Sequence, residues 1–256
     1  MSAVLDALRL DGRAAIVTGA SRGLGRAMAL ALAEAGADVT LAARSVAELE
    51  ETAREVEKLG RRAIVVPTDV TIYAQVETLV ERAAEAHGRL DIVVNNSGIA
   101  TVMPAAEMPP EDFRRSVEVN LVGVFNGCRA VAGRFIGQRA GKVINLASML
   151  GTAGLPGYTA YSASKGGVIA LTRALAVEWA RYNIQVNAMA PGWFVTDMNR
   201  RAFDDPKVRE RLLRDVPARR TGRPEEIGPL VVYLASPASD YMTGQTVFLD
   251  GGHSAA

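Results

Sequence analysis

Short apolar runs rich in β-branched residues alternate with longer segments of helical period along almost the whole chain. The runs cover residues 14–18, 39–43, 63–66, 92–95, 142–146, 185–190 and 246–249. The longer segments, rich in Ala, Leu, Glu and Arg, include residues 25–35, 47–59, 75–87 and 164–181. Strands that alternate with crossover helices form a parallel sheet with helices on both faces. The sequence therefore predicts an α/β fold with a doubly wound parallel sheet of about seven strands.

No low-complexity linker, short repeat or change in composition divides the 256 residues. With 49% hydrophobic residues, a chain of this length buries a large core, and α/β folds of this size often form one unit. We therefore expect a single domain over residues 1–256. The main irregularity is residues 191–224, which we interpret as an extended loop with a short helix that acts as a substrate loop or lid.

Composition and charge exclude several classes of function. Lys and Arg total 29 against 28 for Asp and Glu, so the net charge of +1 favours neither nucleic acid nor a membrane surface as a partner. The single cysteine, Cys128, cannot form an internal disulfide, and the distant His87 and His253 indicate no metal site. Charges interrupt the first 13 residues, unlike a signal peptide, and no uncharged segment reaches membrane-spanning length. We expect a cytoplasmic protein that acts on a small molecule.

The first expected strand leads into a glycine-rich turn with the sequence TGASRGLG at residues 18–25. Gly19, Gly23 and Gly25 have the spacing G-x-x-x-G-x-G, a variant of the dinucleotide-binding fingerprint. Glycine permits the backbone angles of a tight turn, and N–H groups at the start of a helix bind a pyrophosphate. Three glycines alone also fit a purely structural turn. The strand before and the helix after them favour a Rossmann-type dinucleotide site.

The end of the second expected strand indicates which dinucleotide binds. NAD sites usually place a carboxylate there, against the 2′-hydroxyl of the ribose. This chain has Arg44 instead, Arg22 in the glycine turn supplies a second guanidinium, and Asp38 lies at the opposite end of the strand. Guanidinium groups form charge-assisted hydrogen bonds with phosphate. The residues favour NADP(H), and two merely solvated arginines are the alternative.

Tyr161 and Lys165 lie four residues apart in a segment of helical period, so both side chains share one helix face. A tyrosine phenol has a pKa of about 10 and exchanges its proton at neutral pH only where its anion is stabilised. A cationic Lys165 beside an oxidised nicotinamide stabilises that anion. Ser148, after the fifth expected strand, offers a hydroxyl to the substrate oxygen. Each residue alone also fits a helix surface or a turn, and only the combination with the glycine turn favours catalysis.

Together these motifs make the chain resemble the short-chain dehydrogenase/reductase family over nearly its whole length. Further matching positions are Asp69, Asn95 to Gly98 with Ser97 in place of the usual Ala, Asn120, Pro191 with Gly192, and Thr196. The resemblance implies that Asn120, Ser148, Tyr161 and Lys165 are catalytic, Asn120 by supporting a water that links Lys165 to solvent. It implies an NADP(H) site formed by Gly19, Ser21, Arg22, Gly23, Leu24, Gly25, Arg44, Asp69, Val70, Asn96, Gly98, Tyr161, Lys165, Pro191, Gly192 and Thr196.

The resemblance also implies roles and a reaction. Asp69 with Val70 would hold the adenine, Asn96 would border the adenosine ribose, and Thr196 would bind the nicotinamide carboxamide. Hydride passes between C4 of the nicotinamide and a carbonyl carbon while Tyr161 protonates the oxygen, or the reverse occurs for an alcohol. Since members of the family are usually tetramers, we expect a homotetramer.

The substrate is indicated less directly. Its walls are expected from residues 101–108 and 149–158 and from the loop after Pro191, with Trp193, Phe194, Met198 and Phe203. Residues 200–220 carry a net charge of +4. That charge favours an anionic substrate, such as a sugar acid or an acyl group on an acidic carrier protein, unless these residues form only a solvated helix face.

Within the family, the chain resembles gluconate 5-dehydrogenase-like enzymes and 3-oxoacyl-carrier-protein reductases. Two basic residues dock the carrier in those reductases. Arg139 matches one of them, whereas Tyr182, beside Arg181, occupies the other position. We expect an enzyme that acts on CH-OH or C=O groups, with a keto-sugar acid as substrate and a 3-oxoacyl carrier protein as the alternative. A catalytically silent dinucleotide-binding regulator is a hypothesis of another class, against which the complete catalytic set argues.

Overall fold

The computed structural model describes residues 3–197 and 199–256, and its strands join in one parallel sheet. The strands are β1 (Ala14–Thr18), β2 (Asp38–Ala43), β3 (Ala63–Pro67), β4 (Ile92–Asn95), β5 (Gly141–Leu146), β6 (Ile184–Pro191) and β7 (Thr246–Leu249). Their spatial order is β3-β2-β1-β4-β5-β6-β7. Every residue of β1, β4, β5 and β6 is buried, which explains why these strands read as mostly apolar runs rather than alternating ones. The predicted doubly wound α/β fold is confirmed.

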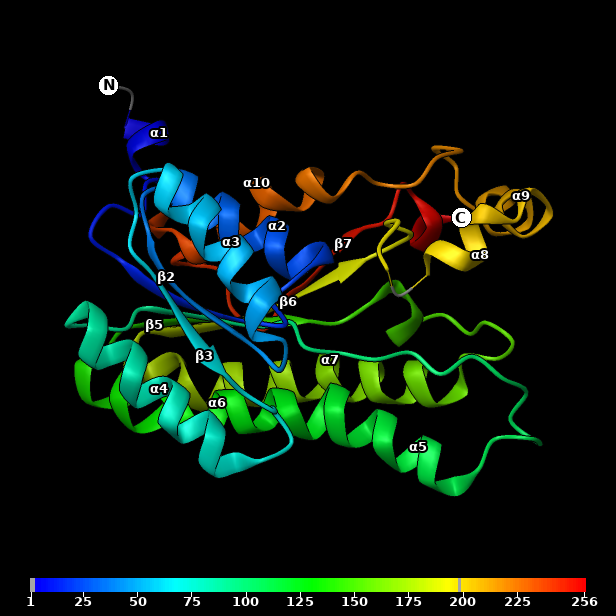
Figure 1. Cartoon of the computed structure of the whole chain (residues 1–256), viewed down its shortest axis with the longest axis horizontal. Helices are drawn as coiled ribbons and strands as arrows, with labels where there is room; N and C mark the ends of the chain where they lie inside the picture. The colour runs from blue at the N-terminus through cyan, green and yellow to red at the C-terminus, as the bar shows by residue number, and fades with distance from the viewer. Residues whose placement is uncertain (1–2, 198) are drawn as a thin grey trace.

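Helices cover both faces of the sheet (Figure 1). One layer holds α2 (Gly23–Glu34), α3 (Val46–Lys58) and α10 (Gly228–Ala235), and the other holds α4 (Tyr73–His87), α6 (Gly123–Gln138) and α7 (Thr159–Trp179). Leu32 of α2 and Val231 of α10 belong to one buried apolar cluster, and Leu79 of α4 and Phe135 of α6 belong to another. The sheet therefore has a separate core on each face.

The sheet changes direction of winding at β1. This strand pairs with β2 on one side and with β4 on the other, so the crossovers on its two sides run to opposite edges. Ligands of such sheets bind beyond the carboxyl ends of the strands at this switch point. The fold thus fixes where the site must be sought.

Segments outside the two layers gather at the ends of the molecule. Helix α5 (Pro110–Val117) continues through the π-helical turn η1 (Glu118–Val122) into α6. Helices α8 (Arg200–Asp204) and α9 (Pro206–Arg214) lie beyond the sheet at the right of Figure 1.

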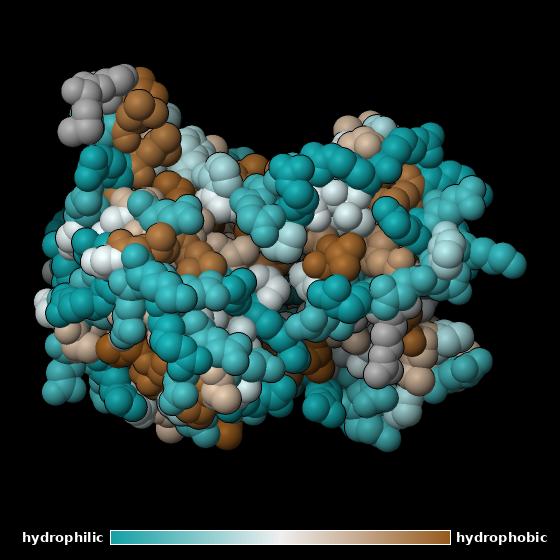
Figure 2. Space-filling view, turned by 45° about the horizontal axis from the view of Figure 1, so that its top comes forward, coloured by the Kyte–Doolittle hydropathy of each residue, from teal (hydrophilic) through white to brown (hydrophobic). Residues whose placement is uncertain are grey.

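Figure 2 shows a mostly hydrophilic face with hydrophobic residues exposed on α1 (Ala3–Asp6) at the upper left and in the hollow toward the right.

The expected strands are all found, with ends that differ by at most one residue. The helix over residues 164–181, which Tyr161 to Lys165 were expected to open, begins at Thr159 and includes Tyr161. Helix propensity alone is a weak guide to this end, and a contact from another segment holds the early turn, since Asn120 donates to Ser164 at 3.0 Å. The expectation of one short helix in residues 191–224 is wrong, because this segment contains two α-helices, α8 and α9. Asp205 caps a second helix by accepting from the N–H of Lys207 at 2.9 Å, which separates α8 from α9.

Within the described residues, no helix combines the length and the hydropathy that a membrane crossing requires. The same part of the chain contains no group of three or more His, Cys, Asp or Glu side chains placed to hold a metal ion.

Candidate active site

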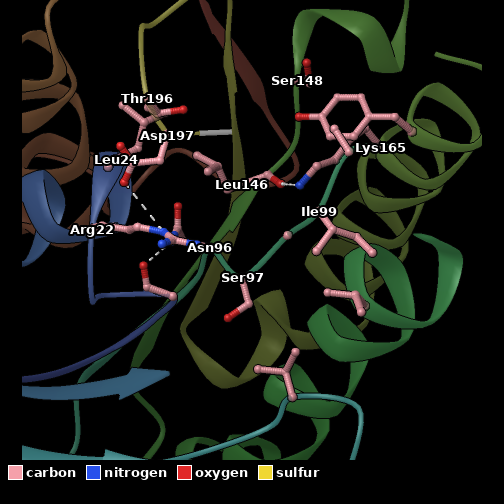
Figure 3. Close-up of a pocket in the computed structure, with 18 of the residues that line it drawn as sticks. Arg22, Leu24, Asn96, Ser97, Ile99, Leu146, Ser148, Lys165, Thr196 and Asp197 are labelled. Atoms are coloured by element: carbon pink, nitrogen blue, oxygen red, sulfur yellow. Dashed lines mark hydrogen bonds and ion pairs between the residues drawn. The ribbon is translucent and has the colours of Figure 1, made fainter. Parts of the chain in front are cut away.

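A cavity of about 1170 Å³ opens at the switch point, beyond the carboxyl ends of the central strands. Every cofactor-binding residue predicted from the sequence lines it, and so does Ser148. Figure 3 shows Arg22 and Asn96 on one side of this cavity and Ser148 and Lys165 on the other. Among the predicted catalytic and cofactor-binding residues, all of which the structure describes, only Asn120 lies behind the wall. The structure therefore brings together residues that span from Gly19 to Thr196 in the sequence.

The glycine turn is held in shape by Asn96. Its Nδ2 donates to the carbonyl oxygens of Thr18 at 2.8 Å and Gly19 at 3.2 Å. Gly19 and Gly23 have φ angles of 65° and 57°, which favour glycine. A Cβ atom on Gly25 would overlap the Gly19 carbonyl oxygen, so the turn closes on the start of α2 only without a side chain there. The first residues of this helix, Gly23, Leu24 and Gly25, line the cavity, where a helix start can bind a pyrophosphate.

The hydroxyl of Thr18 joins the ends of β1 and β4. It accepts from the N–H groups of Asn96 at 2.9 Å and Ser97 at 3.1 Å and donates to the carbonyl of Val94 at 3.4 Å. Ser97 contributes its backbone N–H to this arrangement, which an alanine would do equally well. The departure from the usual residue therefore leaves the backbone here unaffected.

Arg44 and Asp69 lie at the far end of the cavity, where β2 and β3 end. Asp69 accepts from the hydroxyl of Thr71 at 2.7 Å and from its N–H at 3.0 Å. These bonds lower the pKa of Asp69, and the nearby positive charge of Arg44 lowers it further. As its position in the sequence predicts, Asp38 lies at the opposite end of β2. There it pairs with Arg61 and Arg62.

Arg22 lies at the mouth of the cavity between two carboxylates. Its Nη1 is 3.5 Å from Oε1 of Glu48, and its Nε is 3.7 Å from Oδ2 of Asp197. Figure 3 shows Arg22 and Asp197 pointing toward each other. No motif in the sequence indicated either acid, although Glu48 lies four residues after Arg44 and Asp197 directly follows Thr196.

Ser148, Tyr161 and Lys165 meet at the other end of the cavity. The hydroxyl of Ser148 lies near enough to the phenol of Tyr161 to affect its pKa, and it accepts from the N–H of Leu150 at 3.2 Å. The amino group of Lys165 lies 5.7 Å from the centre of the Tyr161 ring. The predicted juxtaposition is therefore present, with Tyr161 and Lys165 on one face of α7.

Burial changes the proton affinity of both α7 residues. It raises the pKa of Tyr161, and the nearby hydroxyl of Ser148 opposes this change. It lowers the pKa of Lys165 to about 8. Lys165 has three N–H donors and gives one of them to the carbonyl oxygen of Leu146 at 2.6 Å. A buried ammonium with further donors facing a cavity is suited to hold ligand hydroxyl groups and to stabilise a phenolate.

Asn120 ties the loop after β4 to α7 from behind the cavity wall. Its Oδ1 accepts from the N–H of Ile99 at 2.8 Å, and its Nδ2 donates to the Ile99 carbonyl at 2.9 Å and to Ser164 at 3.0 Å. The hydroxyl of Ser164 in turn donates to the carbonyl of Tyr161 at 2.7 Å. Asn120 lies in the π-helical turn η1, a feature that often occurs at functional sites.

Aromatic side chains form the wall next to the catalytic end. The ring of Tyr158 meets those of Tyr161 and Trp193 edge to face, with centroids 6.3 and 6.2 Å apart. Phe203 packs on Trp193 at 5.8 Å but is absent from the cavity lining, so its predicted position as a wall residue is wrong. Met198, predicted as another wall residue, lies outside the described residues. The structure adds Arg114 and Arg115 of α5 to the lining, which no local pattern in the sequence indicated.

Comparison with known proteins identifies the family. Residues 19–254 match the family model described as enoyl-(acyl carrier protein) reductase. The chain is 40% identical to 2-dehydro-3-deoxy-D-gluconate 5-dehydrogenase of Escherichia coli, over 97% of this chain and 98% of that protein. It is 39% identical to 3-oxoacyl-(acyl-carrier-protein) reductase FabG of Thermotoga maritima, over 96% and 99% of the two chains.

A solved structure of a relative agrees with these matches. The gluconate 5-dehydrogenase of Burkholderia cenocepacia, determined in complex with NADP and tartrate, superposes with a TM-score of 0.94 at 40% identity, covering 98% of this chain and 99% of that one. The resemblance inferred from the motifs is thereby confirmed over the whole length of the fold. This chain belongs to the short-chain dehydrogenase/reductase family of oxidoreductases.

Proposed function

We propose that this chain is an NADP(H)-dependent oxidoreductase that transfers a hydride between the nicotinamide and a carbonyl or secondary alcohol. The observation that carries the proposal is the meeting of Ser148, Tyr161 and Lys165 at one end of a cavity whose other end is the glycine turn. A nicotinamide cofactor supplies or accepts the hydride when it is bound. The chain's own residues then have to bind, orient and exchange a proton.

The residues present fit such a cofactor. The helix start after the glycine turn would hold the pyrophosphate through Gly19, Ser21, Gly23, Leu24 and Gly25. The adenosine would lie against Asp69, Val70, Asn96 and Gly98, and the nicotinamide end against Pro191, Gly192 and Thr196. Lys165, buried and with donors left over from its bond to Leu146, would hold the ribose hydroxyls of the nicotinamide half.

Arg22 and Arg44 favour the phosphorylated dinucleotide. Both line the cavity, and the end of β2 bears Arg44 where an NAD site usually has a carboxylate. The NADP bound to the related gluconate 5-dehydrogenase supports the same choice. Two guanidinium groups provide the bidentate donors that a 2′-phosphate accepts.

Tyr161 would exchange the proton of the substrate oxygen while Ser148 holds that oxygen in place. The ammonium of Lys165 favours the phenolate form of Tyr161 electrostatically. Asn120, bonded to the loop after β4 and to α7, would position these groups and support a water that returns protons to Lys165. These are the roles that general acid–base catalysis at a carbonyl requires.

A keto-sugar acid is the proposed substrate. The two sugar-acid dehydrogenases to which the chain is similar support this class, and so do Arg114 and Arg115 in the lining, because cationic side chains attract a carboxylate. We infer that residues 1–256 form one dinucleotide-binding and catalytic domain in which residues 191–224, including α8 and α9, form the substrate loop or lid. The family resemblance supports a cytoplasmic homotetramer.

A 3-oxoacyl carrier protein is the second candidate substrate, and one observation favours it. Arg139 donates to the carbonyl of Arg181 at 3.0 Å, and the guanidinium of Arg181 lies 4.8 Å from the centre of the Tyr182 ring. Arg181 thus lies beside Arg139 on the surface and supplies the second cation that Tyr182 lacks. An acidic carrier protein would be attracted to such a pair.

The test is a fluorescence titration of the purified chain with NADPH and with NADH, followed by assays with 5-ketogluconate, other keto-sugar acids and 3-oxoacyl thioesters. Tight binding of NADPH and turnover of a keto-sugar acid are the expected results. Turnover only of carrier-linked thioesters would favour the second candidate. Binding without turnover across a broad panel of carbonyl compounds would favour a silent regulator instead.

A further inference from the structure

The ion pairs of Arg22 link three separate segments at the cavity mouth. Arg22 belongs to the glycine turn, Glu48 to the first turn of α3, and Asp197 to the loop after β6. A second oxygen of Asp197 lies 3.5 Å from Nη2 of Arg200. One guanidinium therefore bridges the adenosine side and the nicotinamide side of the cavity (Figure 3).

These pairs are too long to occupy the donors of Arg22 fully, so a ligand can bind the same guanidinium. The distances of 3.5 and 3.7 Å exceed those of well-formed N–H···O bonds, and the side chains of Arg22 and Glu48 are 63% and 40% exposed. The neighbouring Arg26 differs, because its Nη2 lies 2.6 and 2.5 Å from the two oxygens of Glu55. Arg26 is thus committed to a structural partner, whereas Arg22 keeps donors that a stronger acceptor can take.

Glu48 is an unexpected residue for a site that receives a phosphate. It lines the cavity beside Arg44 and Ser45, and its carboxylate holds the same guanidinium that a 2′-phosphate would use. A carboxylate near a phosphate also repels it. Glu48 therefore acts against a phosphorylated ligand twice, by occupying Arg22 and by its own charge.

Asp197 has a different position. It lies beside Thr196, whose Cγ2 comes within 3.4 Å of the place where a Cβ atom on Gly23 would lie. The pair of Asp197 with Arg22 thus holds the loop after β6 against the glycine turn. A ligand that lies beneath both segments is retained as long as this contact persists.

We propose that Glu48 is a specificity-determining residue that weakens the preference for NADPH over NADH, and that Asp197 is a positioning residue that retains either cofactor. This inference rests on the proposed function. The 2′-phosphate displaces Glu48 from Arg22, while the contact between Arg22 and Asp197 persists and keeps the loop over the cofactor.

Cofactor titrations of Glu48→Gln test the first half. The dissociation constant for NADPH should fall about fivefold at low salt, and that for NADH should change less than about twofold, because only NADPH carries the phosphate. The difference should shrink at about 1 M salt, where exposed charges are screened. Glu51→Gln is the matched control, since Glu51 lies exposed on the same helix outside the cavity lining and its substitution changes the net charge equally.

Asp197→Asn tests the second half. Both dissociation constants should rise about threefold, and stopped-flow displacement should show faster release of both cofactors. Asp204→Asn, an exposed acid on α8, should leave both values unchanged. An unchanged release rate in Asp197→Asn would overturn the positioning role.

The outcomes separate this inference from the proposed function. Tight NADPH binding that Glu48→Gln leaves unchanged, or that improves equally for NADH, would overturn the specificity role alone. A wild-type chain that binds neither dinucleotide would overturn the proposed function and this inference together.

Discussion

Gly25 packs so closely against Gly19 that any side chain on Gly25 would collide with the Gly19 carbonyl oxygen and with the amide of Asn96. The carbonyl is part of the turn, and the amide holds the turn by hydrogen bonds to Thr18 and Gly19, so neither can move without opening it. Gly25→Ala should therefore lower stability by about 1–3 kcal/mol and weaken NADPH binding at least tenfold. Chemical unfolding and fluorescence titration measure the two effects.

A second glycine provides the control. Gly133 lies exposed within α6, and a Cβ atom there would meet no neighbour among the described residues. Gly133→Ala should stabilise the chain by about 0.5–1 kcal/mol through helix propensity and leave NADPH binding unchanged. Equal behaviour of the two variants would contradict the role assigned to Gly25.

Tyr161→Phe should retain the cavity but lose the proton donor. Removal of a general acid typically costs a factor of about 10² to 10⁴ in rate, so turnover should fall by at least 100-fold while the dissociation constant for NADPH changes little. Ser148 keeps a hydrogen-bond partner in this variant, because the N–H of Leu150 still donates to its hydroxyl. Unchanged turnover of every accepted substrate would show that the mechanism is wrong.

Lys165 should set the alkaline limit of carbonyl reduction. Burial lowers its pKa to about 8, so the side chain is charged below that pH and becomes neutral as the pH rises through it. Since the charged form supports Tyr161, kcat/KM for reduction should decline above about pH 8. Initial rates between pH 6 and 10 give the profile. Lys165→Arg, which stays charged, should lack this decline in whatever activity it retains, and a flat wild-type profile up to pH 9.5 would exclude the assignment.

Asn120→Ala should cost both stability and turnover. Asn120 is fully buried, and its substitution leaves the N–H and C=O groups of the half-buried Ile99 without their side-chain partner. A loss of about 2–3 kcal/mol in the free energy of unfolding is expected. Asn187→Ala removes comparable bonds to Met242 and Gln245 away from the cavity, and should lower stability by a similar amount with turnover intact. An equal loss of turnover in both variants would show that Asn120 has only a structural role.

Cys128 should make stability depend on alkaline pH. Burial raises the pKa of its thiol from 9.0 to about 12, so the unfolded chain releases this proton above pH 9 while the folded chain keeps it. The contribution of the thiol is therefore fully present below pH 9 and declines by about 1.4 kcal/mol per pH unit as the pH rises toward 12. The stability of the wild type relative to Cys128→Ala should decrease with this slope in urea unfolding between pH 9 and 10.5. A pH-independent difference would contradict it.

The sequence by itself determined the sheet and most of the site. Fully buried parallel strands have to be apolar throughout, which is why runs such as β1 and β6 could be located to within one residue. The glycine turn and the Tyr161–Lys165 pair are short motifs whose function depends on local spacing, and local spacing is legible in a sequence. The predicted cofactor residues consequently all line the cavity.

Only the tertiary structure decided which side chains from different segments meet. The pairing of Arg22 with Glu48 and Asp197, the contact of Asn120 with Ser164, and the entry of Arg114 into the cavity lining join residues that lie far apart in the chain. Such contacts depend on how the helices pack against the sheet. The periodicity of a sequence does not indicate this packing, because distances between segments are set only when the chain folds.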